Sequence, residues 1–370
     1  MNARNRLPLV LLLIGLVTSH AAGPETTLVL APGPGNPRNS EGDFIRLAQG
    51  DLLFVYTRFA DGARDNSAAV LASRRSKDGG KTWSQVDRVV VENEAAENVM
   101  SVSLLRVAKD RIALIYLRKE SWEDCRPWIR FSSDEGGTWG APSPMIGERE
   151  MGYYVLNNDR VVRLESGRLV APVALHNDPV QKKFDPHARI LCYLSDDDGR
   201  TWHRSRTIRK GETPEGKVML QEPGVVEVGG AKVMLFCRTN KGTQYLSWSE
   251  DGCETFGAFR SSKIYSPRSP ASIERLPGSE SLLMAWNDHE GVQHGKRTPL
   301  TLALSGDGGK SWSTRRVLHD NPNGWYCYTA MEVVGDHVLL GYCAGDRTQN
   351  NGLALSQVTR VPLEWIQRGR

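Results

Sequence analysis

One arrangement of apolar and polar residues recurs along the whole chain. An apolar stretch of strand length, a turn with glycine or aspartate and a second apolar stretch follow one another six times. Short apolar stretches rich in β-branched and aromatic residues, bounded by turn residues, are typical of β-strands. The pattern therefore predicts six hairpins, over Asp43–Tyr56, Val102–Tyr116, Val161–Val173, Val225–Phe236, Ile273–Trp286 and Met331–Tyr342. Helical periodicity is weak throughout, so the indicated fold class is all-β.

A second motif lies between these hairpins. Residues 76–83 read Ser-Lys-Asp-Gly-Gly-Lys-Thr-Trp, and good copies of this octapeptide begin at Ser132, Ser195 and Ser305. A fifth, degenerate copy begins at Ser249. The aspartate can accept hydrogen bonds from the N–H groups of its own turn, and the glycine supplies a positive φ without steric cost. The tryptophan supplies a large apolar surface for packing between sheets. This motif, the Asp box, therefore predicts a tight turn.

The period of the motif indicates the architecture. Consecutive copies begin 54 to 63 residues apart, which is the length of one four-stranded antiparallel blade of a propeller. Six hairpins and five boxes predict one six-bladed β-propeller over residues 22–370. The last hairpin lacks a box. We expect its tail, residues 352–365, to pair with the Pro/Gly-rich arm at 22–38, because a propeller must cover its edge strands.

The first 21 residues have a different character. Arg4 and Arg6 precede the apolar run 7–17, and Ser19-His20-Ala21 offers small residues for cleavage. The eleven residues of that run are too few to cross a bilayer. We interpret residues 1–21 as a secretory signal peptide, and we expect a secreted or periplasmic protein without a membrane span.

Composition narrows the possible partners. The 370 residues carry a net charge of +4 without a dense Lys/Arg run, so nucleic-acid binding is not expected. The six cysteines lack Cys-x-x-Cys spacing, and no His/Cys/Asp cluster has the spacing of metal ligands. Export permits disulfides, and Cys327 and Cys343 in the last hairpin are the first pair to consider.

Five Asp boxes on a six-bladed pattern resemble the sialidase (neuraminidase) superfamily, over nearly the whole chain after residue 21. The resemblance implies three arginines that bind the carboxylate of a sugar, a Tyr/Glu pair that acts as nucleophile and base, and an Asp that acts as acid/base. It implies a retaining exo-hydrolase that releases terminal sialic acid, or a related acidic sugar, from glycans. No metal or organic cofactor is implied.

Two of the three arginines are assigned directly by this resemblance. Arg238 ends the second strand of the fourth hairpin and precedes an Asp box, as the family's second arginine does. Arg297 leads into the last box and is similar to the third arginine. For the first arginine we prefer Arg38, by its distance from the turn glycine Gly50, and Arg46 is the second candidate. A guanidinium at a strand end can reach the mouth of a channel and bind a carboxylate with two hydrogen bonds.

The resemblance also implies the catalytic residues. Glu222 opens the inner strand of the fourth hairpin and is similar to the glutamate that activates the nucleophile. Tyr328 is similar to the nucleophile, and Tyr326 is expected on the same face because side chains alternate along a strand. The acid/base is assigned to Asp65, with Asp43 and Asp61 as competing candidates.

Other functions fit the same pattern. A hydrolase or lyase for another acidic sugar, such as a uronate, would keep the arginines and change the acid. A non-catalytic propeller that binds a glycan or a protein would keep only the boxes, because a fold does not fix a function. A pure interaction scaffold is a further alternative.

Overall fold

The computed structural model describes residues 23–213, 216–290 and 296–368, and residues 1–21, interpreted above as a signal peptide, lie outside them. Nearly all regular structure is β. The first sheet contains β2 (Asn39–Arg46), β3 (Leu52–Phe59), β4 (Ala69–Ser76) and β5 (Arg88–Val91), all antiparallel neighbours in this order. The second contains β6 (Asn98–Ala108), β7 (Arg111–Lys119), β8 (Cys125–Ser132) and β9 (Ser143–Pro144). The third contains β10 (Tyr153–Val155), β11 (Val162–Arg163), β12 (Leu169–Asn177), β13 (Arg189–Ser195) and β14 (His203–Arg204).

The remaining sheets follow the same order. The fourth contains β17 (Gln221–Glu227), β18 (Val233–Arg238), β19 (Thr243–Ser249) and β20 (Arg260–Tyr265). The fifth contains β21 (Ser272–Arg275), β22 (Leu282–Trp286), β23 (Leu300–Ser305) and β24 (Ser313–His319). The sixth contains β25 (Gly324–Val334), β26 (His337–Asp346), β27 (Ser356–Pro362) and β1 (Glu25–Leu30). The short elements outside these sheets are β15 (Glu212–Thr213), β16 (Gly216–Lys217), η1 (Glu148–Glu150), η2 (Arg347–Gln349) and α1 (Leu363–Gln367).

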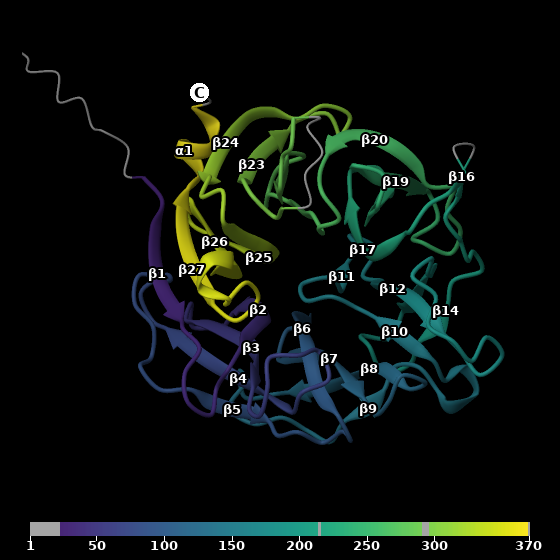
Figure 1. Ribbon diagram of the computed structural model, residues 1–370, viewed down its shortest axis with the longest axis horizontal. Coiled ribbons are helices and arrows are strands. Elements are labelled where there is room, and N and C mark those ends of the chain that lie inside the picture. The colour runs from purple at the N-terminus through teal and green to yellow at the C-terminus, as the bar shows by residue number, and fades with distance from the viewer. Residues whose placement is uncertain (1–22, 214–215, 291–295, 369–370) are drawn as a thin grey trace, which may run out of the picture.

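The sheets lie around a common centre, as Figure 1 shows. A parallel bridge between Tyr153 and Cys125 joins the second and third sheets into one nine-stranded sheet. Each of the six expected hairpins is present, although the first strand of the third, β11, has only two residues. The prediction that the two ends of the chain pair is confirmed, because β1 lies antiparallel to β27 with Leu30 opposite Ser356.

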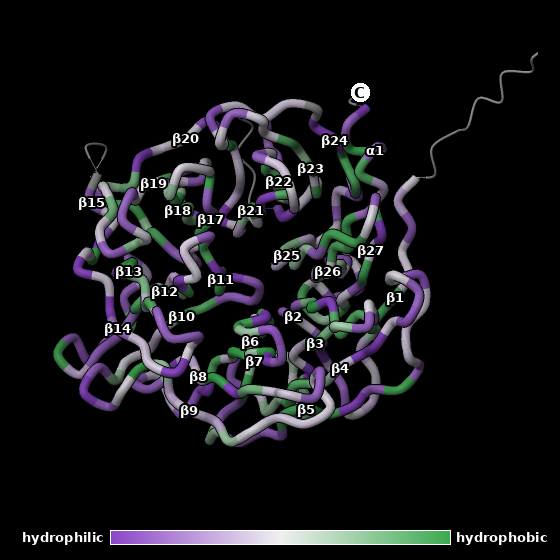
Figure 2. Tube along the Cα trace, turned by 180° about the vertical axis from the view of Figure 1, so that it is seen from behind, coloured by the Kyte–Doolittle hydropathy of each residue, from purple (hydrophilic) through white to green (hydrophobic). Residues whose placement is uncertain are grey.

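The hydrophobic core lies between neighbouring sheets. One buried cluster joins Phe54 of β3 to Leu339 of β26, and another joins Leu235 of β18 to Cys192 of β13. Figure 2 shows the hydrophobic stretches along strands such as β7, β12 and β26, with mostly hydrophilic loops at the periphery. Corresponding clusters fill the other interfaces between consecutive sheets. The apolar faces of the strands therefore hold each sheet against the next.

The Asp boxes fold as expected. In the second box, Asp134 accepts hydrogen bonds from the N–H group and hydroxyl of Thr138, both at 2.7 Å, and from the hydroxyl of Ser132 at 2.8 Å. These hydrogen bonds lower the pKa of Asp134 to about 2. The turn also packs on the preceding sheet, since a Cβ at Gly136 would lie 2.8 Å from Leu53 Cδ2. The box is therefore a structural element that joins consecutive sheets.

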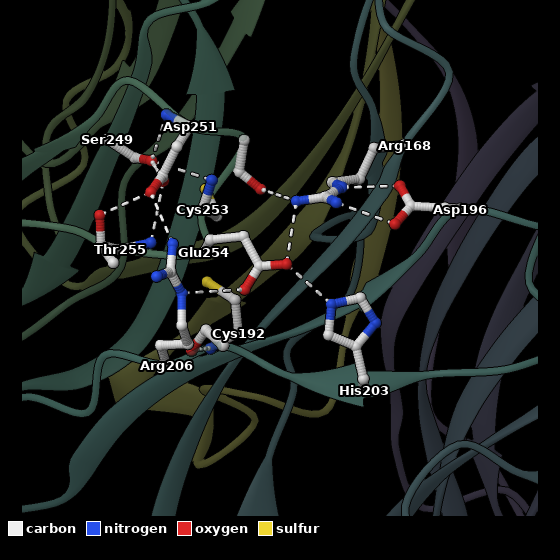
Figure 3. A network of polar contacts seen from close by, with 12 residues as sticks. Arg168, Cys192, Asp196, His203, Arg206, Ser249, Asp251, Cys253, Glu254 and Thr255 are labelled. Carbon is white, nitrogen blue, oxygen red and sulfur yellow. Dashed lines mark hydrogen bonds and ion pairs between the residues drawn. The ribbon is translucent and has the colours of Figure 1, made fainter.

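The degenerate box keeps this geometry at a cost. Cys253 occupies the glycine position with a φ of 69°, a conformation that costs a non-glycine residue about 1–2 kcal/mol. Figure 3 shows the polar contacts that link this turn to the third sheet. Glu254 accepts a hydrogen bond from His203 at 2.9 Å and lies 3.4 Å from Arg168, which also binds Asp196. These contacts stabilise a turn that has Cys253 and Phe256 where the other boxes have a glycine and a tryptophan.

Two further sequence expectations concern cysteines and membranes. All six cysteines are buried free thiols. Cys327 and Cys343 are cross-strand partners in β25 and β26, but no disulfide joins them. Within the described ranges, no helix has the length and hydrophobicity needed to cross a bilayer.

Candidate active site

Tyr328 and Glu222 come together from the sixth and fourth sheets. The Tyr328 hydroxyl donates a hydrogen bond to Glu222 Oε1 at 3.2 Å. Both residues have a positive φ, 58° for Tyr328 and 49° for Glu222. Each lies where the register of its inner strand shifts, between Cys327 and Ala330 in β25 and between Gln221 and Gly224 in β17. Such bulges re-aim a side chain and are frequent beside active sites.

The bulge in β25 overturns one sequence expectation. Regular alternation would place Tyr326 on the same face as Tyr328. The shifted register separates them, and Tyr326 instead stacks on His319 with the ring centroids 4.8 Å apart. It belongs to the buried cluster between the fifth and sixth sheets. Tyr326 is therefore a core residue and not a second candidate for the nucleophile.

The Tyr328 hydroxyl is neutral in this environment. Burial raises its pKa most, the negative charge of Glu222 raises it further, and Arg297 and Arg238 act in the opposite direction. The phenol therefore keeps its proton until a base removes it. The residue in contact with that proton is Glu222.

Arg238 anchors the other oxygen of this carboxylate. Its Nη1 lies 2.8 Å from Glu222 Oε2, and its Nη2 donates a hydrogen bond to Gln221 Oε1 at 3.0 Å. Gln221 and Arg238 face each other across the β17–β18 ladder. The sequence did not single out Gln221, because a glutamine at a strand start carries no distinctive signal. Its contact nevertheless orients the guanidinium of Arg238.

Arg297 contacts the ring of Tyr328. Its guanidinium carbon lies 5.2 Å from the centre of the Tyr328 ring and 5.4 Å from that of Trp325. Its Nη1 lies 2.9 Å from Cys327 Sγ. A cation over an aromatic face is held by the negative potential of the ring. Arg238 therefore contacts one member of the Tyr328–Glu222 pair and Arg297 the other.

Arg38 lies on the same side of the molecule. It directly precedes β2 and is buried against Phe59, with the guanidinium carbon 4.5 Å from the ring centre. Its Nη2 donates a hydrogen bond to Ser40 Oγ at 3.3 Å, and that oxygen lies 3.4 Å from Cys343 Sγ. Cys343 is in turn the cross-strand partner of Cys327, which Arg297 contacts. A short path of contacts thus connects Arg38 with Arg297.

The structure separates the two candidates for the first arginine. Arg46 is the last residue of β2, so the whole strand lies between it and Arg38. Asn158 links the middle of β2 to Tyr328, because its side-chain amide donates to the carbonyl of Gly42 at 2.8 Å and to that of Tyr328 at 3.1 Å. The contacts through Ser40 and Cys343 lead toward Arg297 from the Arg38 end of the strand. Arg46 is exposed at the other end of β2, where its backbone carbonyl accepts a hydrogen bond from Arg106 Nη2 at 3.5 Å. The geometry favours Arg38.

Of the three candidate acids, Asp65 contacts a candidate arginine. Its Oδ1 lies 2.5 Å from Arg38 Nη1, and its side chain is 68% exposed. Its backbone carbonyl is held by the amide of Asn98 at 2.9 Å and by Lys119 Nζ at 3.3 Å. Asp61 instead accepts a hydrogen bond from the Ala68 N–H group inside its own loop.

Asp43 lies in a different place. It accepts hydrogen bonds from the N–H groups of Phe44 and Leu104 and lines a cavity of about 350 Å³. The same cavity is lined by other ionisable side chains, Asp159, Arg160, Arg163, Glu165, Glu227, Glu274, Arg275 and Glu332. Burial raises the pKa of Asp43 well above its ordinary value. Asp43 therefore belongs to this second cavity.

An aromatic cluster borders the Asp65 loop. Trp122 stacks on Tyr153 at 5.2 Å, and Phe184 meets both rings edge to face at 5.8 Å. Phe184 also stacks on His176, the residue that ends the return strand of the third hairpin, at 4.6 Å. Burial lowers the pKa of His176. This cluster was not anticipated, because Trp122 and Phe184 lie in loops and Tyr153 in a strand of only three residues, far apart in the sequence.

Three polar residues that flank strands of the fifth sheet, Arg268, Asn287 and Asp288, have local partners. Asn287 donates to the carbonyl of Pro299 at 3.0 Å, and Asp288 pairs with Arg315 at 2.7 Å. Arg268 is exposed and contacts the sulfur of Met219. Among the residues that the structure describes, no group of three or more His, Cys, Asp or Glu side chains is arranged to hold a metal ion.

Comparisons with known proteins identify the family and the fold. The family described as "BNR repeat-like domain" matches residues 50–341. A sialidase from Bacteroides fragilis is 24% identical over 346 residues, which cover 84% of this chain and 59% of that protein. The chain therefore spans little more than half of that relative.

Solved sialidase structures have a similar fold. The Hadza microbial sialidase Hz136 aligns with a TM-score of 0.71 at 18% identity, over 89% of this chain and 66% of its own. The K499G mutant of the NanB sialidase from Streptococcus pneumoniae aligns with a TM-score of 0.71 at 15% identity, over 92% and 71%. At these identities the likeness concerns the fold.

Proposed function

Because the chain belongs to the BNR repeat-like family within the sialidase superfamily, we propose that it is a retaining exo-glycosidase that releases terminal sialic acid, or a related acidic sugar, from glycans. The observation that carries the proposal is the hydrogen bond between Tyr328 and Glu222, with Arg238 paired with Glu222 and Arg297 against the ring of Tyr328. Neutral nucleophile, base and cations thus occur together in one place.

The first step is recognition of the substrate carboxylate. Arg38, Arg238 and Arg297 would bind it, because guanidinium groups present paired N–H donors to a carboxylate. A negative charge beside the reacting carbon would repel a carboxylate nucleophile. A neutral tyrosine avoids that repulsion, which explains why an acidic sugar calls for a phenol in place of the usual second carboxylate.

The second step is attack and proton transfer. Glu222 takes the phenolic proton as Tyr328 Oη bonds to the anomeric carbon, and the bond to the leaving oxygen breaks. Asp65 gives its proton to that oxygen. In the second half-reaction Asp65 removes a proton from a water that attacks the anomeric carbon, the bond to Tyr328 Oη breaks, and Glu222 returns its proton to the phenol.

Covalent trapping tests this proposal most directly. A fluorinated sialosyl fluoride should slow the second half-reaction and leave a sugar adduct on the peptide that contains Tyr328, detected by mass spectrometry. Tyr328→Phe should form no adduct and release no fluorophore from an aryl sialoside. An adduct on another residue, turnover of uronides alone, or glycan binding without turnover would each overturn it.

The proposal also includes the architecture of the protein and its localisation outside the cytoplasm. We propose that the sheets are six blades of one propeller over residues 22–370, supported by an apolar cluster at each interface between consecutive sheets and by the pairing of β1 with β27. We also propose that residues 1–21 direct export and are removed. The N-terminal sequence of the protein recovered from outside the cytoplasm tests the cleavage.

A further inference from the structure

Another cavity, separate from the candidate active site and from the cavity at Asp43, lies between the fourth and fifth sheets. It has a volume of about 580 Å³ and opens between strands β19 and β20 on one side and the Asp-box turn of the fifth sheet on the other. None of the six candidate site residues lines it. Its volume falls in the range of about 300–1,000 Å³ that is usual for small-molecule sites.

The lining combines aromatic and cationic side chains. The aromatic residues are Trp248, Trp286 and Trp312, and the cationic ones are Lys263, Lys310 and Arg315. No carboxylate lines the cavity within the described part of the chain. We propose that this cavity is a second binding site for an acidic oligosaccharide.

The tryptophans suit the sugar rings. An indole face carries partial negative charge, which attracts the polarised C–H groups on the face of a pyranose. Trp248 and Trp312 are each partly exposed, whereas Trp286 is buried and donates to the carbonyl of Tyr265 at 3.2 Å. Trp312 Nε1 is buried and has no hydrogen-bond partner among the described residues. The partly exposed ring of Trp312 is therefore available to a ligand, whereas one face of the Trp248 ring is covered by Lys232 Nζ, 5.0 Å from the ring centre.

The tryptophan of the first Asp box is covered by a strand of the chain itself. Trp83, the equivalent of Trp312, is only 5% exposed, and its indole N–H donates to Thr27 Oγ1 of β1 at 3.1 Å. Leu30, also in β1, belongs to the same buried cluster as Trp83. Trp312, like Trp139 and Trp202 of the second and third boxes, is partly exposed, and it borders the cavity.

The charges select an anion. Lys263 and Lys310 are exposed, and neither forms an ion pair within the residues described. The nearby Asp307 accepts hydrogen bonds from its own turn, including the hydroxyl of Ser311 at 2.6 Å, so it leaves the lysines free. Arg315 is paired with Asp288 and contributes less positive charge. A carboxylate-bearing sugar would therefore bind in preference to a neutral one.

A second site would increase turnover of polymeric substrates. A glycan chain held at this cavity raises the effective concentration of its termini at the active site. That consequence rests on the proposed function, whereas binding at the cavity does not. The two claims therefore have separate readouts.

Binding is measured on the full chain carrying Tyr328→Phe, so that nothing is cleaved. A trimer of sialic acid is titrated while the indole N–H resonance of Trp312, assigned with Trp312→Phe, is followed by NMR. We expect that resonance to shift on saturation, and Lys263→Glu with Lys310→Glu to weaken binding at least tenfold. Lys81→Glu, at the same position of the first box, should leave the affinity unchanged.

Kinetics on the otherwise unchanged chain give the second readout. The lysine pair of substitutions should raise KM for a polymeric acidic glycan several-fold and leave the kinetics of a small aryl sialoside as they are. An unmoved Trp312 resonance, equal binding of a neutral trisaccharide, or equal loss in Lys81→Glu would overturn the second site. A lack of aryl sialoside turnover would instead contradict the proposed activity.

Discussion

Tyr328 and Glu222 are 106 positions apart in the sequence, yet the tyrosine hydroxyl donates to the glutamate at 3.2 Å. Each side chain is aimed by a bulge in its own inner strand, with a positive φ at the residue itself. The same bulge position carries Glu41 in β2, with a φ of 51°, and Ser101 in β6, with a φ of 60°. The fold therefore repeats a β-bulge with a positive-φ residue in four inner strands, and each bulge carries a different side chain.

Removing the base should slow the reaction without weakening binding. Glu222→Gln keeps the shape but cannot accept the phenolic proton, so we expect kcat for an aryl sialoside to fall about 10²–10⁴-fold with little change in KM. Glu227→Gln, at the end of the same strand, is the matched control and should retain full activity. Unchanged kcat in Glu222→Gln would eliminate Glu222 as the base.

Arg38 and Arg46 can be separated by the same conservative exchange. Lysine cannot reproduce the paired N–H donors of arginine. We expect Arg38→Lys to raise KM for a sialoside about 10–100-fold, and Arg46→Lys, at the opposite end of β2, to leave it unchanged. The reverse result would assign the first arginine to Arg46.

Glu41 should give the substrate affinity a dependence on pH. Burial raises the pKa of Glu41 to about 7, and its Oε1 lies 3.8 Å from Arg38 Nη2. Below pH 7 the carboxyl is neutral and leaves the charge of Arg38 to the substrate, whereas above pH 7 it ionises and competes. We therefore expect KM to rise as the pH passes through about 7.

The control for this prediction is Glu41→Gln, which keeps the carbonyl oxygen and cannot ionise. Its KM should stay flat across the same pH range. A wild-type profile that Glu41→Gln reproduces would show that another group controls the pH dependence.

Glu332 should make the fold less stable at higher pH. Burial, together with the negative charge of Asp159, raises the pKa of Glu332 to about 7 from an ordinary 4.5. The folded state thus favours the protonated form, and this stability is present below pH 4.5 and lost as the pH rises through 7. Glu332→Gln cannot ionise, so its free energy of unfolding should fall less between pH 5 and pH 8 than that of the wild type, by at most about 3 kcal/mol. The free energies of unfolding of both proteins at these two pH values measure the difference. Parallel pH profiles of the two proteins would contradict it.

Gly224 should tolerate no side chain. A Cβ there would lie 2.2 Å from Phe236 Cζ, so Gly224→Ala must displace the ring or the strand that carries Glu222. We expect a loss of about 1–3 kcal/mol in unfolding free energy, together with reduced kcat. Gly147→Ala is the control, because no atom lies within 4 Å of its Cβ position and its φ is −71°. Equal stability of the two variants would argue against this packing.

Much of the fold could be predicted from local pattern. The hairpins and the Asp boxes depend on short stretches, in which alternating apolar residues and one turn aspartate suffice to specify the conformation. Asp134 and Thr138 form their contacts within five residues. The closure of β1 on β27 was also predictable, because an unpaired edge strand is unfavourable.

The site was predictable only in part. Tyr326 looked equivalent to Tyr328 because regular alternation assigns both to one face, and the bulge that separates them has no clear mark in the sequence. Arg38 and Arg46 likewise differ only in which end of β2 each occupies. Gln221 and Asn158 are not part of a recognisable motif, although Gln221 accepts a hydrogen bond from Arg238 and Asn158 donates one to the carbonyl of Tyr328.

The sequence by itself determined the strands, the turns and the residue types available for chemistry, since these depend on neighbours along the chain. The tertiary structure decided which of them meet. Tyr328 and Glu222 come from two sheets and Arg297 from the segment that precedes β23 of a third, and their contacts depend on how those sheets pack around a common centre. That packing is a sum of many apolar contacts between distant segments, which no local stretch of sequence contains.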